Sequence, residues 1–294
     1  MQESPDEKIN ISWFPGHMAK ARRMLEENIK LVDAVCEIAD ARIPLSSRNP
    51  DLAGLTAAKP RLLIFNRADL ADPNITANWR EYFKGNKEPF IETDSKSGAG
   101  ISGFPRAVRE LLKEKLNKSA SKGLRPPVLR VMVVGITNVG KSSFINRAAK
   151  RKAAPAADRP GVTRGKQWIT VDSGLELLDT PGLLWPKFDD PETGELLAIT
   201  GAIPNEMTDA AELAAGFMAR LKKYYPEAIK SRYDFIPEDN DSGHELLQKA
   251  AKRRAFLMPG GDYDIERMAY VLFDEFRAGK LGRISLERPD IRTK

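Results

Sequence analysis

Residues 129–150 constrain the fold and the chemistry of this chain more than any other stretch of its sequence. An apolar, β-branched run at residues 129–134 leads into the spacing G-x-x-x-x-G-K-S, formed by Gly135, Gly140, Lys141 and Ser142. Residues 143–150 then follow a helical pattern. Small glycines let consecutive backbone N–H groups curl around a phosphate, and the start of the helix adds its positive dipole. Because strand, glycine turn and helix come in this order, we predict a phosphate-binding loop.

The same loop supplies the groups that a nucleoside triphosphate and its Mg²⁺ need. Lys141 is expected to place its cation beside the β- and γ-phosphates, and the Ser142 hydroxyl to ligate Mg²⁺. We expect the loop to contact the nucleotide through Asn138, Val139, Gly140, Lys141, Ser142 and Ser143.

Two later segments complete the predicted Mg²⁺ and γ-phosphate contacts. Asp179 ends a predicted strand, which is where a carboxylate reaches Mg²⁺ beside a phosphate loop. Gly182 follows and can present its backbone N–H to the γ-phosphate. Thr163 lies between the two motifs, and we expect its hydroxyl to close over Mg²⁺ and the γ-phosphate as a catalytic group, together with Lys141.

The choice of base is predicted to fall to the segment Asn66-x-x-Asp69, at the end of a predicted strand. A carboxylate accepts two hydrogen bonds, and guanine offers a matching donor pair in its N1–H and its exocyclic amino group. Adenine offers no such pair, so Asp69 selects guanine. Ser95 and Lys96 follow the next predicted strand, one βα unit later. We therefore predict that the base is bound by Asn66, Arg67, Asp69, Ser95 and Lys96.

The pattern of elements predicts an α/β domain followed by a small all-α domain. Strands are predicted at residues 31–39, 62–65, 89–92, 129–134, 167–171 and 175–178. Helices are predicted at residues 19–30, 74–84, 103–118 and 143–150, and residues 184–205 are expected to be loop-rich. Alternating strands and helices favour a mostly parallel sheet flanked by helices, over residues 1–205. Residues 206–294 are predicted to be helical and to contact RNA or the ribosome, with a capping box at Ser242 and Glu245.

The net charge of +6 is concentrated in one region. Residues 106–166 contain 16 Lys and Arg against 3 Asp and Glu, whereas residues 206–294 balance at 16 against 16. One nucleotide does not need all of these positive charges, and a polyanionic partner could bind to the remaining ones. By itself the charge fits a solvated face equally well.

Several sequence features bear on location. There is no run of about 18 apolar residues, so no membrane span is expected. The N-terminal segment is acidic and lacks the apolar core of a secretory signal. Cys36 is the single cysteine and lies in an apolar stretch, so we expect it to be buried, without an intrachain disulfide. These features fit a reducing cytoplasm.

The order of the motifs resembles that of a Ras-like GTPase domain that has been circularly permuted. The guanine motif and the Ser95–Lys96 loop precede the phosphate loop, Thr163 and the segment Asp179-Thr-Pro-Gly182. With the opening Trp13-Phe-Pro-Gly-His17-Met-Ala-Lys-Ala, this set is similar to the RbgA/YlqF family of large-ribosomal-subunit assembly GTPases. The resemblance implies a cytoplasmic GTPase that uses Mg²⁺, binds GTP and GDP, and acts on the large ribosomal subunit or its precursor through rRNA and ribosomal proteins. We expect a monomer.

The resemblance also implies roles for single residues. In this family an Asn at the position of Asn138 is associated with potassium-stimulated hydrolysis, so the resemblance implies that Asn138 helps to hold a K⁺ beside the phosphates. Leu183 stands where Ras-type enzymes have a water-orienting Gln, so we expect slow hydrolysis by the free protein. His17 matches the histidine that the family assigns to catalysis, and we expect it to orient the water. Arg67 replaces the usual Lys of N-K-x-D but keeps a long aliphatic stem for the guanine face.

Two other functions fit parts of the pattern. A phosphate-loop kinase is disfavoured by the Asn66/Asp69 pair and by the lack of a recognisable acceptor site. A GTP-dependent signalling switch that does not act on ribosomes is disfavoured because the sequence has neither a lipidation motif nor a basic amphipathic helix.

Overall fold

The computed structural model describes residues 15–150, 168–180, 182, 190–203 and 209–289, with side chains from Arg22 onward. It divides into two compact units. The first, called here the sheet unit, comprises Phe14–Trp185 together with Glu287–Lys294, and the second, the helical unit, includes Pro186–Leu286.

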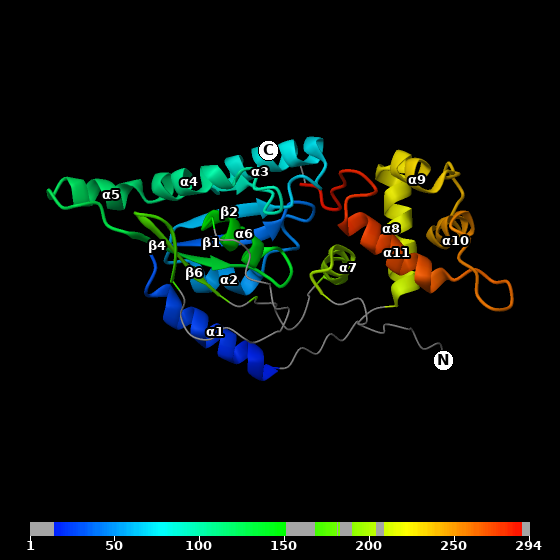
Figure 1. Cartoon of the computed structure of the whole chain (residues 1–294), viewed down its shortest axis with the longest axis horizontal. Helices are drawn as coiled ribbons and strands as arrows, with labels where there is room; N and C mark the ends of the chain where they lie inside the picture. The colour runs from blue at the N-terminus through cyan, green and yellow to red at the C-terminus, as the bar shows by residue number, and fades with distance from the viewer. Residues whose placement is uncertain (1–14, 151–167, 181, 183–189, 204–208, 290–294) are drawn as a thin grey trace, which may run out of the picture. The chain divides into compact units, whose positions relative to one another are not determined.

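One six-stranded sheet, in the order β3-β2-β1-β4-β6-β5, organises the sheet unit (Figure 1). Its strands are β1 (Ala34–Asp40), β2 (Arg61–Asn66), β3 (Phe90–Glu92), β4 (Leu129–Val134), β5 (Trp168–Asp172) and β6 (Leu175–Asp179). All neighbouring strands are parallel except β5 and β6. The central strand β1 is buried at every residue, as expected for a parallel strand covered on both faces. The predicted α/β fold with a mostly parallel sheet is confirmed.

Helices of the sheet unit are α1 (Pro15–Ile29), α2 (Pro50–Thr56), α3 (Pro73–Gly85), α4 (Phe104–Leu111), α5 (Lys113–Ala120) and α6 (Lys141–Ala148). Leu25 of α1 and Leu52 of α2 pack in one apolar cluster with Met132 and Val134 of β4. A second cluster joins Ile75, Trp79 and Phe83 of α3 to Leu63 and Phe65 of β2. These clusters fix the helices on the strands whose ends carry the candidate site.

Four details of the predicted elements were wrong. The first helix begins at Pro15 and not at residue 19, since proline suits the first helical position, and His17 therefore lies on this helix. The short helix α2 was not predicted. The helix predicted at residues 103–118 is two helices, which meet at Leu112. Within residues 184–205, expected to be loop-rich, the structure has helix α7 (Pro191–Thr200), capped by Asp190.

The helical unit contains α7, α8 (Ala210–Tyr224), α9 (Pro226–Tyr233), α10 (Gly243–Arg253) and α11 (Ile265–Arg277). Phe217 of α8 meets Phe276 of α11 with ring centroids 5.0 Å apart. Arg277 donates from α11 to the carbonyl oxygens of Ala198 and Ile199, so α7 is packed into this unit. The unit therefore starts earlier than the boundary placed at residues 205/206. The predicted capping box at Ser242 is present, and no helix among the described residues is long and apolar enough to cross a membrane.

Candidate nucleotide-binding site

The candidate site residues gather at one edge of the sheet, where the parallel strands end. β1 ends at Asp40, β2 at Asn66, β3 at Glu92, β4 at Val134 and β6 at Asp179. In open α/β sheets, ligands bind in the crevice outside the carboxyl ends of the strands. Loops that are far apart in the chain thus meet at the place where a ligand is expected.

Two glycines allow the phosphate loop to lie close to its neighbours. Gly135 has a φ of 151° and Gly140 a φ of 93°, in the range that favours glycine. A Cβ on Gly135 would stand 2.5 Å from the carbonyl oxygen of Ile38 in β1, and one on Gly140 would stand 2.3 Å from Nδ2 of Asn66. Neither position has room for a side chain, so the loop is held directly against β1 and the guanine motif.

Lys141 begins α6 and lies buried beneath the loop. Its Nζ donates to the carbonyl oxygen of Ile136 at 2.5 Å. Burial lowers its pKa to about 8, and the nearby Asp179 carboxylate opposes that shift. A Cβ on Gly182 would lie 2.9 Å from this Nζ, so the Asp-x-x-Gly segment passes close to the lysine. A buried cation with one carboxylate neighbour is suited to an incoming anion such as a phosphate.

The described residues suit Mg²⁺ held partly by phosphate oxygens. The Ser142 and Ser143 side chains are exposed at the start of α6, and burial raises the pKa of Asp179 while Lys141 lowers it. A cation beside Asp179 would favour its ionised form. Among the described residues no three acidic, His or Cys side chains cluster as a metal site of their own. Mg²⁺ usually takes one or two carboxylates together with substrate phosphates and water, so the Asp179 carboxylate suits this ion.

Asn66 joins the phosphate loop to the loop after β3. Its Nδ2 donates to the carbonyl oxygen of Val139 at 2.9 Å. Its Oδ1 accepts from the backbone N–H of Ser95 at 3.0 Å and from the Ser95 hydroxyl at 2.7 Å. Since Asn66 is buried, these bonds are made away from competing water, where they are stronger. The side chain assigned to the base from sequence thus also ties two loops together.

Asp69 and Lys96, both assigned to the base from sequence, are exposed residues, and the Lys96 cation is close enough to act on the Asp69 carboxylate. Partial burial, followed by the Asp94 carboxylate, raises the pKa of Asp69. Asp94 shapes the turn by accepting from the backbone N–H groups of Lys96 at 2.7 Å and Ser97 at 3.1 Å. Hydrogen-bond donors of a base at Asp69 would favour its carboxylate form.

Arg67 and Arg147 reinforce this edge in ways that the motifs did not reveal. Arg67 donates through Nη2 to the carbonyl oxygen of Asn138, at 2.7 Å. Arg147, in the last turn of α6, donates to the carbonyl oxygens of Ser95 and Lys96. The phosphate-loop helix therefore holds the second base-binding loop. Nothing in the local sequence around Arg147 signals this contact.

Three predicted residues cannot be compared with this geometry. Thr163 and Leu183 lie outside the described residues. His17 falls in the first turn of α1, but its side chain lies outside the described side chains. Their roles remain predictions.

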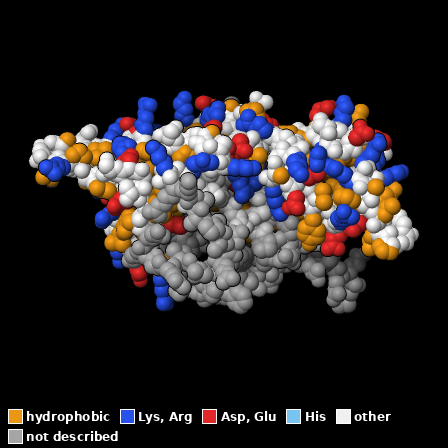
Figure 2. Space-filling model, in the orientation of Figure 1, with side chains coloured by type: hydrophobic (Ala, Val, Ile, Leu, Met, Phe, Trp, Pro, Cys, Tyr) orange, Lys and Arg blue, Asp and Glu red, His pale blue; other side chains and the backbone are white. Residues whose placement is uncertain are grey.

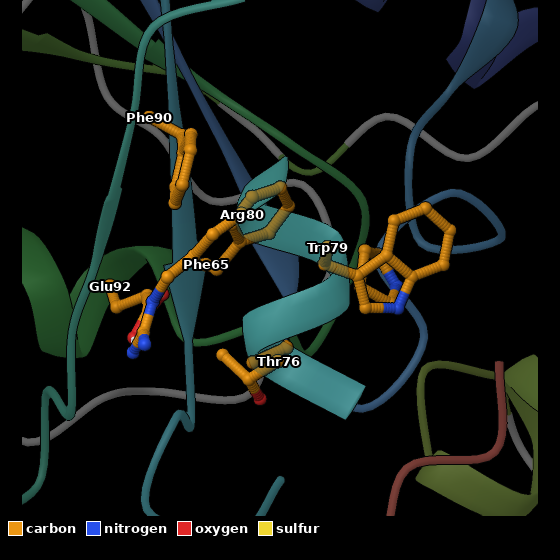
Figure 3. Close-up of a pocket in the computed structure, with 8 residues that line it drawn as sticks. Phe65, Thr76, Trp79, Arg80, Phe90 and Glu92 are labelled. Carbon is orange, nitrogen blue, oxygen red and sulfur yellow. Dashed lines mark hydrogen bonds and ion pairs between the residues drawn. The ribbon is translucent and has the colours of Figure 1, made fainter. Parts of the chain in front are cut away.

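A small pocket lies away from the phosphate loop, between α3 and the strands β2 and β3 (Figure 3). Its walls are largely apolar, with Phe65, Trp79 and Phe90 among them. Arg80 and Glu92, its charged members, pair with each other at 2.6 Å. The pocket therefore offers no unpaired charge for catalysis and is not the nucleotide site.

The sheet order, the glycine loop and the guanine motif together define a GTPase domain in which the guanine motif precedes the phosphate loop. A family model described as "50S ribosome-binding GTPase" matches residues 130–218. Ribosome biogenesis GTPase A of Bacillus cereus is 45% identical over 282 residues, covering 95% of this chain and 94% of the relative. The chain therefore belongs to the ribosome biogenesis GTPase A (RbgA/YlqF) family, and it is a GTPase.

More distant relatives agree. Ribosome biogenesis GTPase A of Thermotoga maritima is 31% identical, over 95% of both chains. A GDP-bound YlqF structure is 26% identical with a TM-score of 0.65, covering 91% of this chain and 100% of that one. GNP-bound YlqF from T. maritima is 27% identical with a TM-score of 0.61, covering 92% of this chain and 99% of that one. The predicted family and GTPase activity are confirmed, and the kinase alternative loses its support.

Proposed function

We propose that this chain uses GTP hydrolysis to time its release from an assembling large ribosomal subunit. It binds the precursor particle in the GTP state and leaves it in the GDP state. The observation that supports this most is the joining of the guanine motif to the phosphate loop by Asn66 and Arg67, because a guanine nucleotide needs both motifs at one place. The relative from B. cereus is named for ribosome biogenesis, and the matching family model for 50S binding.

Within this proposal each site residue has a physical role. Asp69, Ser95 and Lys96 bind guanine, and the backbone of residues 138–143 binds the phosphates. Lys141 stays charged against the phosphates, and Ser142, Thr163 and Asp179 hold Mg²⁺. Mg²⁺ supplies positive charge against the charge that develops on the phosphoryl oxygens. Gly182 donates its N–H to the γ-phosphate.

Hydrolysis by the free chain is slow, because Leu183 offers no polar atom to the attacking water. His17 orients that water once the particle has docked, and Asn138 holds a K⁺ that stabilises the phosphate charge. His17→Ala should keep GTP and particle binding but lose particle-stimulated hydrolysis. If the particle still stimulates hydrolysis fully in this variant, another group orients the attacking water. Equal hydrolysis rates in K⁺ and Na⁺ would contradict the K⁺ site at Asn138.

The surface around α4 and α5 fits a polyanion such as rRNA. Helix α5 buries none of its residues, and Figure 2 shows Lys and Arg side chains projecting from this part of the molecule. Lys118, Lys122 and Arg125 follow one another here with no acidic residue between them. Phosphate groups would release counterions from such a surface, which makes binding favourable and salt-dependent.

The chain's path supports coupling between the nucleotide and the helical unit. It leaves the sheet unit shortly after Gly182 and returns to it at Glu287. A segment that contacts the γ-phosphate through Gly182 would therefore pass its movement directly into the helical unit, as loops around a γ-phosphate do in other switches.

Co-sedimentation with purified ribosomal subunits tests the proposal. The chain should pellet with large-subunit precursors in a non-hydrolysable GTP analogue and stay in the supernatant in GDP. Lys141→Ala should lose the nucleotide response, whereas Lys84→Ala, which removes an exposed lysine in the last turn of α3, should retain it. Equal pelleting with both nucleotides, or pelleting with the small subunit, would contradict the proposal.

A further inference from the structure

Asp40 occupies the centre of the nucleotide edge. It is the last residue of β1 and lies beside Asn66 in the register with β2. On its other side β1 pairs with β4, the strand that leads into the phosphate loop. The sequence predicted only a loop at this position. The side chain is 2% exposed, so its charge must be balanced within the protein.

Two arginines balance the Asp40 carboxylate. Arg42, itself fully buried, donates through Nε to Oδ1 at 2.9 Å and through Nη2 to Oδ2 at 2.7 Å. Its backbone N–H adds a bond to Oδ1 at 3.0 Å. Arg67 completes the set by donating through Nη1 to Oδ2 at 3.0 Å. Arg42 therefore binds both oxygens of the Asp40 carboxylate, and Oδ2 also accepts a hydrogen bond from Arg67.

The Arg67 guanidinium therefore has two ends with different partners. One end is held by Asp40, and the other donates to the carbonyl oxygen of Asn138 in the phosphate loop. Asn138 has a φ of 57°, a conformation that costs energy in a residue with a side chain. A donor at its carbonyl oxygen opposes relaxation of that peptide.

We propose that Asp40 is a positioning residue for the nucleotide, which orients Arg67 and through it fixes the Asn138 peptide of the phosphate loop. This inference rests on the nucleotide site proposed above. It also explains why arginine suits this position. A guanidinium is a planar fork whose nitrogens reach two acceptors at fixed angles, whereas the ammonium of lysine is a compact charge on a flexible stem.

The test compares GDP affinity and steady-state hydrolysis for the full-length chain and the variants Asp40→Asn, Arg67→Lys and the double variant. Each single variant should weaken GDP binding about tenfold, as expected for the loss of one hydrogen bond to a charged group. The double variant should be no weaker than the weaker single variant, because both changes break the same bridge. KM should rise while kcat stays within about twofold, since neither residue touches the reacting atoms.

Glu37→Gln is the matched control for lost stability. Glu37 is another buried acid of β1, and its ion pairs are with Arg48 and Arg61, at 3.2 and 3.1 Å, rather than with Arg67. It should destabilise the fold but leave GDP affinity unchanged. A general loss of stability would lower the active fraction, and hence the apparent kcat, rather than raise KM.

Two results would overturn the inference. One is wild-type GDP affinity in Arg67→Lys. The other is a double variant in which the losses of GDP affinity caused by Asp40→Asn and Arg67→Lys multiply. If Asp40→Asn does not fold, Arg67→Lys decides alone, because it keeps the charge and changes only the reach. Lys141→Ala separates this failure from failure of the proposed site: unimpaired GDP binding in that variant would show that the nucleotide binds elsewhere.

Discussion

Gly140→Ala should damage the protein even when no nucleotide is bound. An added Cβ would lie 2.3 Å from Nδ2 of Asn66, far inside van der Waals contact. That amide donates to Val139 and, through its oxygen, accepts two bonds from Ser95. The new methyl group would push the Asn66 side chain away from both loops.

The expected loss in the free energy of unfolding is the sum of two costs. A φ of 93° in a residue with a Cβ costs about 1–2 kcal/mol. Leaving a buried polar group of Asn66 or its partners unsatisfied costs about 1–3 kcal/mol more. The sum, roughly 2–5 kcal/mol, is a large share of the roughly 5–15 kcal/mol that stabilises a typical domain.

Equilibrium unfolding in urea, without nucleotide, measures this loss, and binding of a fluorescent GDP measures its effect on the site. Gly54→Ala is the matched control: Gly54 lies in α2 of the same unit, and a Cβ there would meet no atom within 4 Å. It should be neutral or stabilise by about 0.5–1 kcal/mol, because alanine favours a helix. If Gly140→Ala unfolds at the wild-type urea concentration and loses only GDP binding, the clash is with the phosphate and the reasoning from Asn66 fails.

Three further predictions concern the same edge. Gly182→Ala should weaken GTP binding measured by calorimetry, because its Cβ would lie 2.9 Å from Nζ of Lys141 and displace the ammonium from the phosphates, and a charge-assisted bond is worth about 1.5–3 kcal/mol. Asp69→Asn should weaken GTP binding about 10- to 100-fold and favour xanthosine triphosphate, whose C2 oxygen accepts from the new amide; wild-type GTP affinity would refute the guanine assignment. Burial would raise the pKa of Asp40, but Arg42 and Arg67 lower it from 3.8 to about 2. Because the pKa of Asp40 is lower in the folded than in the unfolded state, its carboxylate contributes about 2 kcal/mol of stability above pH 4, and this contribution is lost as the pH falls toward 2. Urea unfolding at several pH values should find a smaller pH dependence in Asp40→Asn.

The parts of the fold and site that the sequence could predict depend on neighbours in the chain. The apolar run before Gly135, the glycine spacing and the residues at strand ends are local signals, and they predicted β4, the loop and the sheet edge. The start of α1 was misplaced because its apolar spacing begins only after Pro15, although proline is favoured at the first helical position.

The unpredicted contacts join residues that are distant in the chain. Asp40 and Arg67 are separated by 27 residues, and Arg147 and Lys96 by 51. An arginine in the last turn of a helix is usually a solvated charge, and an Asp after a strand is usually part of a loop. Only the parallel register of β1 with β2 and β4 brings these groups to one place, and that register is a property of the folded sheet.

Glu287 shows how far along the chain such a contact can reach. Its carboxylate accepts from the backbone N–H of Leu45, at 2.6 Å, and from Ser46, across 242 and 241 residues of chain. The preceding residue, Leu286, is the last of the helical unit, and its carbonyl oxygen accepts from Arg220 of α8. Adjacent residues thus belong to different units, and each is held by contacts within its own unit. The Glu287 contacts hold the loop after β1, which also carries Arg42. Since Arg42 holds Asp40, Glu287 supports the same end of the sheet that carries the candidate site, through a contact that no local sequence signal could have predicted.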